Sequence, residues 1–378
     1  MEDKIAVIGH SYHLKTRSSS FFTDLLRKYY NVEFMADSSW QGKKGLKISH
    51  LDGSYKAVIF FQMISQEYLK EIECQNVIFV PMYDQSGDAP MSFWYRLRNV
   101  KVISFCKALG THLHMLGFDV LDVTYYPKPM GDLKLATSNT CFFWQRTNVI
   151  SWQKVKVLLS NLRMKSVHIH TAIDPGYTFT KPSLRDEKRY NIHYSKWFRN
   201  QCDYLQAVDE NQIYIAPRLK EGIGMSFLEA MARGKVVVAA DRPTMNEYIK
   251  NGYNGYLFDP DKIEPIDFSD IEKVGANAIL TIEEGYQKWV SQERSIIDFI
   301  EKPVRKNFYF RRHPFARFDE LTIKSVFKGV IKAILPFGIV KFVRYLRDNG
   351  RWKRIIKEAV KLVIPYGVMQ IIWKAKKR

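Results

Sequence analysis

Two glutamates with a glycine-rich turn between them are the residues of this chain best suited to chemistry. Glu221 and Glu229 have seven residues between them, and an apolar strand is expected to end shortly before them, at Pro217. A helix is predicted from about Met225 to Gly234, because a glycine can adopt the left-handed conformation that ends helices. One glutamate therefore lies on a loop, and the other lies on the helix that follows it.

The loop and the first turn of this helix suit an anion. Gly222 and Gly224 allow a tight backbone and the close approach of a ligand. The N–H groups of Met225, Ser226 and Phe227 have no partner within the helix, because they belong to its first turn. A phosphate or diphosphate is the kind of ligand that these N–H groups favour.

The two carboxylates suit another part of the same ligand. Glu229 is expected about one turn into the helix, where it reaches vicinal hydroxyls such as those of a ribose, and Glu221 lies nearer the far end of the ligand. Together they indicate a site for a nucleotide diphosphate joined to a group rich in hydroxyls. The alternative is an ordinary strand, loop and helix with solvated glutamates; the glycines, the helix end and the following valine strand favour the site.

Two series of apolar strands must position this turn. The first series is predicted at residues 4–9, 56–61, 76–80 and 100–105, with helix-compatible segments between them. The second is predicted at 140–144, 166–170, 211–217 and 235–240, with a helix at 151–162 and the helix from about 225. Continuous apolar strands separated by helices are typical of parallel sheets that are covered on both faces.

A chain of 378 residues is long enough for two packed cores. We expect an α/β protein with two doubly wound, Rossmann-like domains that face a ligand cleft. A segment with proline and glycine at 124–134 suits the linker between them. The predicted parts are a first domain at 1–128, a second at 129–285, a helix crossing back at 286–320 and a basic amphipathic helical tail at 321–378.

The segment from Glu221 to Pro260 resembles the donor-site signature of family 4 glycosyltransferases, which have the GT-B fold and retain anomeric configuration. The shared features are the two glutamates and their spacing, the "EAMA" helix end, the valine strand, and the "NG" turn before "YLFDP". The resemblance is firm over 205–262 and looser over 1–205. It implies that the second domain binds the sugar donor and that the first lies on the acceptor side.

The resemblance also implies residue roles. Glu229 would bind the donor ribose, Glu221 would lie beside the transferred sugar, and the helix start from Gly224 to Ser226 would hold the diphosphate. Arg146 matches the arginine that neutralises the leaving nucleotide. The lysine that usually follows about five residues later is missing, since Ser151 and Trp152 stand there; Lys154 is a candidate, and Arg218 or Lys220 are substitutes.

The loops after the first-domain strands hold the acceptor-side candidates. Gly9, His10 and Lys15 follow the first strand, where His10 either contacts the transferred sugar or acceptor or serves as a loop hydrogen-bonder. Asp84 follows a later strand, where related enzymes often carry a His-Asp pair, and here Tyr83 replaces the histidine. The alternative for Asp84 is a turn aspartate that caps the next helix.

The resemblance implies transfer without a metal or other cofactor. In front-face attack the leaving phosphate accepts the acceptor proton, so the enzyme supplies positioning and charge stabilisation. The sequence has no Asp-x-Asp motif. His168 and His170 share one face of a strand, yet no third ligand stands at recognisable spacing, so core or cleft histidines are the better interpretation.

Composition narrows the compartment and the class of partner. Four widely spaced cysteines without a C-x-x-C pair indicate reduced thiols, and the N-terminus lacks the features of a secretory signal, so we expect a cytoplasmic protein. The net charge is +19, and residues 321–378 hold 15 Lys/Arg against 2 Asp/Glu. The excess of basic residues therefore belongs mainly to the tail.

The tail contains two similar segments, 331–347 and 360–376, each with an apolar core, a Pro-x-Gly kink and basic borders. Neither has the apolar length of a membrane span. Their composition favours helices that lie in the headgroup layer of an anionic leaflet. The residues expected at that surface are Lys332, Lys341, Arg344, Trp352, Lys361 and Trp373. Core packing and nucleic-acid binding are the alternatives, and no nucleic-acid-binding signature supports the latter.

The sequence therefore predicts a retaining glycosyltransferase on the inner face of the bacterial cell membrane. It would move a sugar from a nucleotide diphosphate sugar to a lipid-linked or glycan acceptor in the synthesis of a surface polysaccharide or lipopolysaccharide. The alternatives are a catalytically idle scaffold that acts as a membrane adaptor or binds nucleic acid, and a nucleotide-sugar epimerase. The presence of Glu221, Gly224, Glu229 and Arg146 together favours the enzyme.

Overall fold

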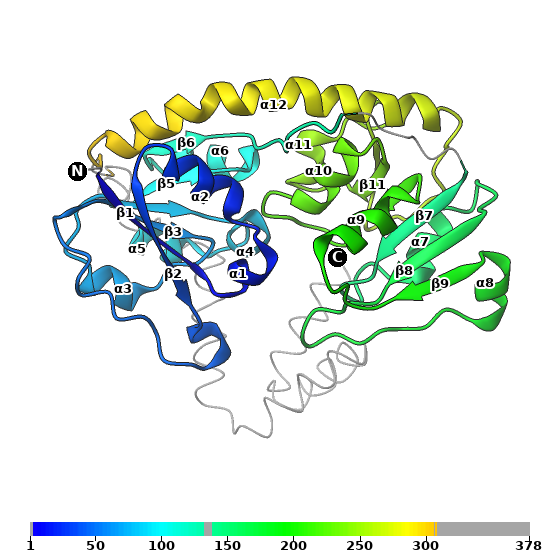
Figure 1. The fold of residues 1–378 in the computed structure, drawn as a ribbon, viewed down its shortest axis with the longest axis horizontal. Helices are drawn as coiled ribbons and strands as arrows, with labels where there is room; N and C mark the ends of the chain where they lie inside the picture. The colour runs from blue at the N-terminus through cyan, green and yellow to red at the C-terminus, as the bar shows by residue number, and fades with distance from the viewer. Residues whose placement is uncertain (1–2, 132–137, 306, 308–378) are drawn as a thin grey trace, which may run out of the picture. The chain divides into compact units, whose positions relative to one another are not determined.

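The computed structural model describes residues 3–131, 138–305 and 307. These residues contain two parallel six-stranded sheets, which belong to one compact unit (Figure 1). The strands of the first sheet are β1 (Lys4–His10), β2 (Asn31–Asp37), β3 (Tyr55–Phe61), β4 (Val77–Val80), β5 (Lys101–Ser104) and β6 (Val120–Asp122). Their order across the sheet is β2-β1-β3-β4-β5-β6.

The second sheet follows the same plan. Its strands are β7 (Thr140–Trp144), β8 (Ser166–His170), β9 (Ile192–Ser195), β10 (Ile213–Ile215), β11 (Val236–Ala240) and β12 (Tyr256–Phe258). Their order is β12-β11-β10-β7-β8-β9, and all neighbouring strands are parallel. The predicted α/β class with two Rossmann-like sheets is confirmed.

Short helices connect the strands within each sheet. Those of the first half are α1 (Tyr12–Thr16), α2 (Ser20–Arg27), α3 (Gln66–Glu71), α4 (Tyr83–Ser86), α5 (Met91–Arg96) and α6 (Lys107–Met115), with a 3₁₀ turn at Ser39–Gln41. Those of the second half are α7 (Trp152–Leu158), α8 (Leu184–Arg189), α9 (Gln201–Asp209), α10 (Met225–Ala232) and α11 (Met245–Tyr248). Helix α7 is shorter than the helix predicted at 151–162.

Apolar strands form the centre of each core. The side chains of β1 from Ile5 to Ile8 are fully buried, as are those of β10. All five residues of β11 are buried as well, which explains its unbroken apolar sequence. Parallel strands that are buried on both faces place their carboxyl ends, and the loops that follow, at one edge of the sheet.

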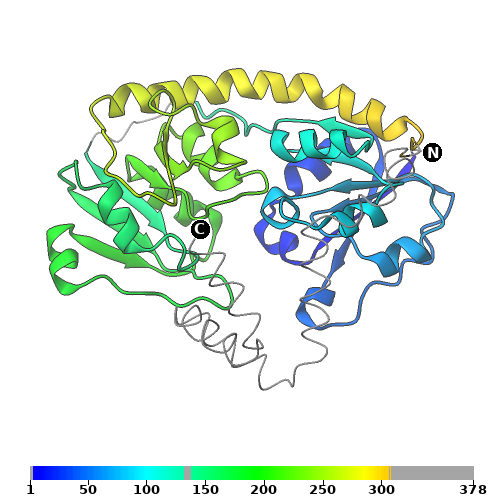
Figure 2. The same ribbon diagram turned by 180° about the vertical axis from the view of Figure 1, so that it is seen from behind.

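One long helix, α12 (Ile271–Glu301), runs along elements of both halves, as Figures 1 and 2 show. Near its start, Gly275 packs so closely on the backbone of Gly234 that a Cβ would lie 3.0 Å from that carbonyl oxygen. Near its end, the buried Lys101 donates hydrogen bonds to the carbonyl oxygens of Phe299 and Ile300. The boundary expected at residue 286 falls inside this helix.

Candidate active site

The start of α10 has the geometry of an anion site. Gly224 is its N-cap residue, with a φ of 82° in the left-handed region. A Cβ at this position would lie 1.9 Å from Cε1 of Phe227, so only glycine fits. Gly224 offers no side chain to the free N–H groups of Met225, Ser226 and Phe227. Gly234 has a φ of 66° just after the helix, as predicted for its C-terminal end.

Gly222 allows a tight turn and also leaves room for a neighbouring side chain. A Cβ there would lie 2.7 Å from the sulfur of Met82, which directly precedes α4. The hydroxyl of Thr244 donates a 2.7 Å hydrogen bond to the carbonyl oxygen of the neighbouring Glu221. Met82 therefore packs against Gly222, and Thr244 binds the backbone of the turn.

Glu221 is a buried carboxylate, with 9 % of its surface exposed. Burial raises its pKa to about 7, and the positive charge of Arg218 opposes this shift. The charges of Asp84, Asp174 and Arg146 also act on it. The loop glutamate is thus surrounded by charged groups that the sequence places far apart.

Glu229 lies on α10 among tyrosines. Burial raises the pKa of its carboxyl group, and the nearby guanidinium of Arg233 opposes the shift. Burial also raises the pKa values of Tyr125 and Tyr204, and the charge of Glu229 adds to both shifts. The charge of Glu229 therefore acts on both phenols, and its side chain is partly buried.

Four charged residues meet at the carboxyl edges of the sheets. Arg146 follows β7, and its Nε and Nη2 lie 3.0 and 2.8 Å from Oδ1 of Asp174, which follows β8. Arg218 follows β10 and reaches the other oxygen, Oδ2, of Asp174 at 2.8 Å. A second nitrogen of Arg218 lies 3.0 Å from Oδ2 of Asp84 on α4. We call Arg146, Asp174, Arg218 and Asp84 the charged cluster.

Asp174 was missed in the sequence, although its position gave a signal. It follows β8, and the loops after the carboxyl ends of parallel strands are where ligands bind in α/β sheets. Trp144 supports the same cluster, because the guanidinium carbon of Arg146 lies 4.7 Å from the centre of its ring. Arg146 is thus held by the Trp144 ring, and both arginines are held by the carboxylate of Asp174.

The two lysines considered as the second cation, Lys154 and Lys220, are not part of the charged cluster. Lys154 is on α7, half-buried, and no ion pair of its side chain occurs in the described part of the chain. Lys220 pairs instead with Asp88 at the surface. Arg218 is the candidate that the structure brings into the charged cluster together with Arg146.

Asp84 lies in the first turn of α4, whose N-cap residue is Met82, and its side chain is 14 % exposed. Burial raises its pKa, and the charge of Arg218 opposes this shift. Its Oδ1 is buried and has no hydrogen-bond partner among residues 3–131, 138–305 and 307. The side chain therefore joins the charged cluster through one oxygen only.

His10 ends β1 and packs against aromatic rings. Its ring stacks on Trp40, with centroids 4.1 Å apart, and its Nδ1 accepts a hydrogen bond from the backbone N–H of Tyr12 at 3.1 Å. Burial lowers its pKa, which favours the neutral ring. Lys15 lies close by in sequence and places its ammonium 4.7 Å from the ring centre of Trp197, after β9.

His168 and His170 are held by protein contacts. Nε2 of His168 and Nδ1 of His170 each lie 2.8 Å from the hydroxyl oxygen of Ser195 on β9. Burial lowers the pKa of both rings to about 4. Within the described residues, no group of three His, Cys, Asp or Glu side chains is arranged to hold a metal. The four cysteines are free thiols.

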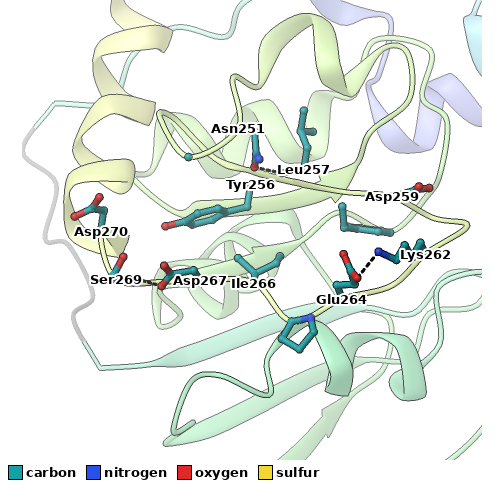
Figure 3. Close-up of a pocket in the computed structure, with 13 residues that line it drawn as sticks. Asn251, Tyr256, Leu257, Asp259, Lys262, Glu264, Ile266, Asp267, Ser269 and Asp270 are labelled. Carbon is teal, nitrogen blue, oxygen red and sulfur yellow. Dashed lines mark hydrogen bonds and ion pairs between the residues drawn. The ribbon is translucent and has the colours of Figure 1, made fainter.

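A separate pocket of about 430 Å³ lies beside β12 and the loop that leads to α12 (Figure 3). Its polar lining includes Asp259, Asp267 and an ion pair between Lys262 and Glu264. None of the residues predicted to bind the donor lines it. The charged cluster and α10 therefore remain the candidate site.

The two parallel Rossmann-like sheets form the GT-B fold. Residues 187–270, from α8 to the residue before α12, match the family described as glycosyl transferases group 1. No curated protein matches the chain in sequence.

Solved structures share its fold. Sucrose-phosphate synthase from Thermosynechococcus elongatus aligns with a TM-score of 0.56 and 11 % identity, over 78 % of this chain and 98 % of that one. Alr3699/HepE from Anabaena, in complex with UDP and glucose, aligns with a TM-score of 0.53 and 14 % identity over the same shares. TarM aligns with a TM-score of 0.49 and 16 % identity; the alignment covers 66 % of this chain, which spans 55 % of TarM. At these identities, the alignments with sucrose-phosphate synthase and HepE show the fold alone.

Proposed function

We propose that the protein transfers a sugar, with retention of configuration, from a nucleotide diphosphate sugar to a lipid-linked or glycan acceptor in bacterial surface polysaccharide synthesis. The observation that carries the proposal is the arrangement around α10. An uncapped helix start, two glutamates and two arginines gather where the loops leave parallel strands. The UDP and glucose in the HepE structure, which has the same fold, support a nucleotide sugar as the donor.

Each group has a proposed place on the donor. The N–H groups of Met225 and Ser226 hold the diphosphate, and the guanidinium of Arg146 neutralises it. Glu229 accepts hydrogen bonds from the ribose hydroxyls, which its desolvated carboxylate would bind strongly. Glu221 contacts the hydroxyls of the transferred sugar.

The reaction requires little acid or base from the protein. The bond between the anomeric carbon and the phosphate oxygen breaks as the acceptor oxygen attacks the same face of the sugar. The proton of the acceptor hydroxyl passes to an oxygen of the leaving diphosphate. The protein holds both substrates in line and stabilises the growing negative charge, and these two effects supply most of the rate in such sites.

The acceptor side is proposed to involve Asp84 and His10. Asp84 has a buried oxygen without a partner in the described residues, and an acceptor hydroxyl would satisfy it. His10 lies at the carboxyl end of β1 with an exposed aromatic neighbour, Trp40, which suits the apolar face of a sugar.

The membrane-surface residues proposed above lie in the tail, outside the described residues. They are Lys332, Lys341, Arg344, Trp352, Lys361 and Trp373. In the part of the chain that the structure describes, no helix has the length and apolar character needed to cross a membrane. A peripheral location would raise the local concentration of a lipid-linked acceptor.

A panel of nucleotide sugars tests the proposal. We expect one or more UDP-, GDP- or dTDP-sugars, or the free nucleotides, to raise the melting temperature of the wild-type chain. Glu229→Ala should abolish the shift, because the ribose loses its carboxylate partner, whereas Glu283→Ala on the exposed surface of α12 should keep it. A panel without any stabilisation would contradict the proposal, and binding that survives Glu229→Ala would contradict the ribose assignment.

A further inference from the structure

The leaving diphosphate carries more negative charge than one arginine balances, and the lysine expected after β7 is missing. The structure places a second guanidinium, that of Arg218, beside the same carboxylate as Arg146. Arg146 and Arg218 bind opposite oxygens of the same carboxylate, that of Asp174. Their charged ends therefore lie on either side of a group that is comparable in size to one phosphate.

A guanidinium binds carboxylate and phosphate oxygens through the same fork of N–H donors. A site in which two such forks converge on a carboxylate is therefore also shaped for a phosphate group. The charge of Asp174 itself would repel a diphosphate at short range. Donor and Asp174 are consequently competitors for Arg146 and Arg218.

Other buried atoms at this edge also lack partners. Gln145, next to Arg146, is fully buried, and neither its amide nitrogen nor its amide oxygen has a hydrogen-bond partner in the described part of the chain. Oδ1 of Asp84 is in the same situation. Buried polar atoms without partners are rare in folded proteins and indicate a place for a polar ligand or water.

We infer that Arg218 supplies the second positive charge at the leaving diphosphate, in place of the missing lysine, and that Asp174 occupies the two guanidiniums until the donor displaces it. The inference rests on the proposed function. It gives the carboxylate of Asp174 the role of an internal substitute for phosphate. It also explains why Lys154, on α7, and Lys220, paired with Asp88, need no part in the site.

Inorganic pyrophosphate is the probe that tests this without knowledge of the base or the sugar. Isothermal titration with the full chain should show binding that weakens at least tenfold in Arg218→Gln. Arg218→Lys should fall between the two, because it keeps the charge and loses the fork. Lys154→Gln and Lys220→Gln should bind within twofold of the wild type, as neutralisations of cations outside the charged cluster.

Asp174→Asn distinguishes two roles of Asp174, which either competes with the diphosphate for the arginines or positions them. A competitor that loses its charge should leave pyrophosphate binding about three- to tenfold tighter, since neither arginine is any longer held by a carboxylate. Asp88→Asn, which frees Lys220 in the same way, should leave binding unchanged. Weaker pyrophosphate binding by Asp174→Asn would show that Asp174 positions the arginines. Its proposed role as a competitor would then be wrong.

The outcomes also distinguish the inference from the proposed function. If the wild type binds neither pyrophosphate nor any nucleotide sugar, both are wrong. If the wild type binds pyrophosphate and both Arg218→Gln and Arg218→Lys bind it as tightly as the wild type does, only the inference is wrong. Melting curves of each variant identify a loss of binding that follows from unfolding, and Arg218→Lys then carries the test because it keeps a positive charge beside Asp84 and Asp174.

Discussion

Glu221 is held where its charge depends on pH near neutrality. Its burial raises the pKa to about 7 in the folded chain, against an ordinary value of 4.5. Between these values the folded chain keeps a proton that the unfolded chain releases. The free energy of unfolding must therefore fall as pH rises through this window, and the total effect is on the order of 3 kcal/mol at most.

Glu221→Gln should remove this pH dependence. The amide has the shape of the protonated acid and no charge to desolvate, so the variant should unfold with the same free energy as the wild type at pH 4.5 and a larger one at pH 8. Urea unfolding at a series of pH values measures this. A slope that persists in the variant would assign the titration to another buried group, such as Asp84, whose pKa is also raised by burial.

The residue scale also shows what sequence alone leaves open. Glu221, Glu229 and Arg146 were identified by spacing and resemblance, since each follows a strand in a fixed order. Asp174 carried no such pattern, and its role depends on two arginines from different loops meeting on one carboxylate. Loop conformation brings them together, and apolar periodicity contains no information about it.

At the scale of elements, the start of α10 depends on one glycine. Gly224→Ala would place a methyl group on the ring of the fully buried Phe227, in addition to straining a left-handed backbone. We expect a loss of stability of about 2–3 kcal/mol and at least tenfold weaker nucleotide binding. Chemical unfolding and titration with the best donor from the panel measure the two effects.

Gly42→Ala is the matched control for this prediction. Gly42 has a φ of 75°, close to the 82° of Gly224, yet no atom lies within 4 Å of its added Cβ. The control therefore carries the backbone strain alone, about 1 kcal/mol, and should bind nucleotide normally. Equal effects of the two substitutions on binding would contradict a specific role for the α10 turn.

The strands that the sequence predicted and those that it missed differ in one physical property. The central strands, such as β1 and β11, are buried on both faces and read as unbroken apolar runs. The missed strands are β2, β6, β9 and β12, which form the four edges of the two sheets. Edge strands are short or partly exposed, and polar residues interrupt most of them, so their sequences resemble loops.

At the scale of the whole molecule, hydrogen bonds join residues that follow strands of the two sheets. The carboxylate of Glu247, on α11, accepts hydrogen bonds from the backbone N–H groups of Lys107 and Ala108 at the start of α6, at 2.7 and 2.9 Å. Arg218 joins the loop after β10 to Asp84 on α4. If the donor displaces Asp174 from Arg218 as proposed, it acts on the residue that also binds Asp84, and we expect donor binding to affect this contact between the two halves.

The net positive charge of the chain lies mainly in the tail, not in the candidate site. Residues 321–378 hold 15 of the 58 basic residues and only 2 of the 39 acidic ones. The site itself balances its arginines with Asp174 and Asp84, so it contributes little to the net charge. If the tail meets an anionic leaflet, each basic residue near the surface contributes about 1 kcal/mol of attraction.

Neutralising four of these residues in the full chain tests the membrane role. The variant with Lys332, Lys341, Arg344 and Lys361 replaced by Gln should bind vesicles of phosphatidylglycerol and phosphatidylcholine at least a hundredfold more weakly in a sedimentation assay. Replacing the exposed Lys43, Lys44, Lys47 and Lys70 by Gln removes the same charge elsewhere and should change binding less than threefold. Equal losses of vesicle binding in both variants would show that only the net charge of the chain matters. Unchanged binding in the tail variant would place the membrane contact outside the tail.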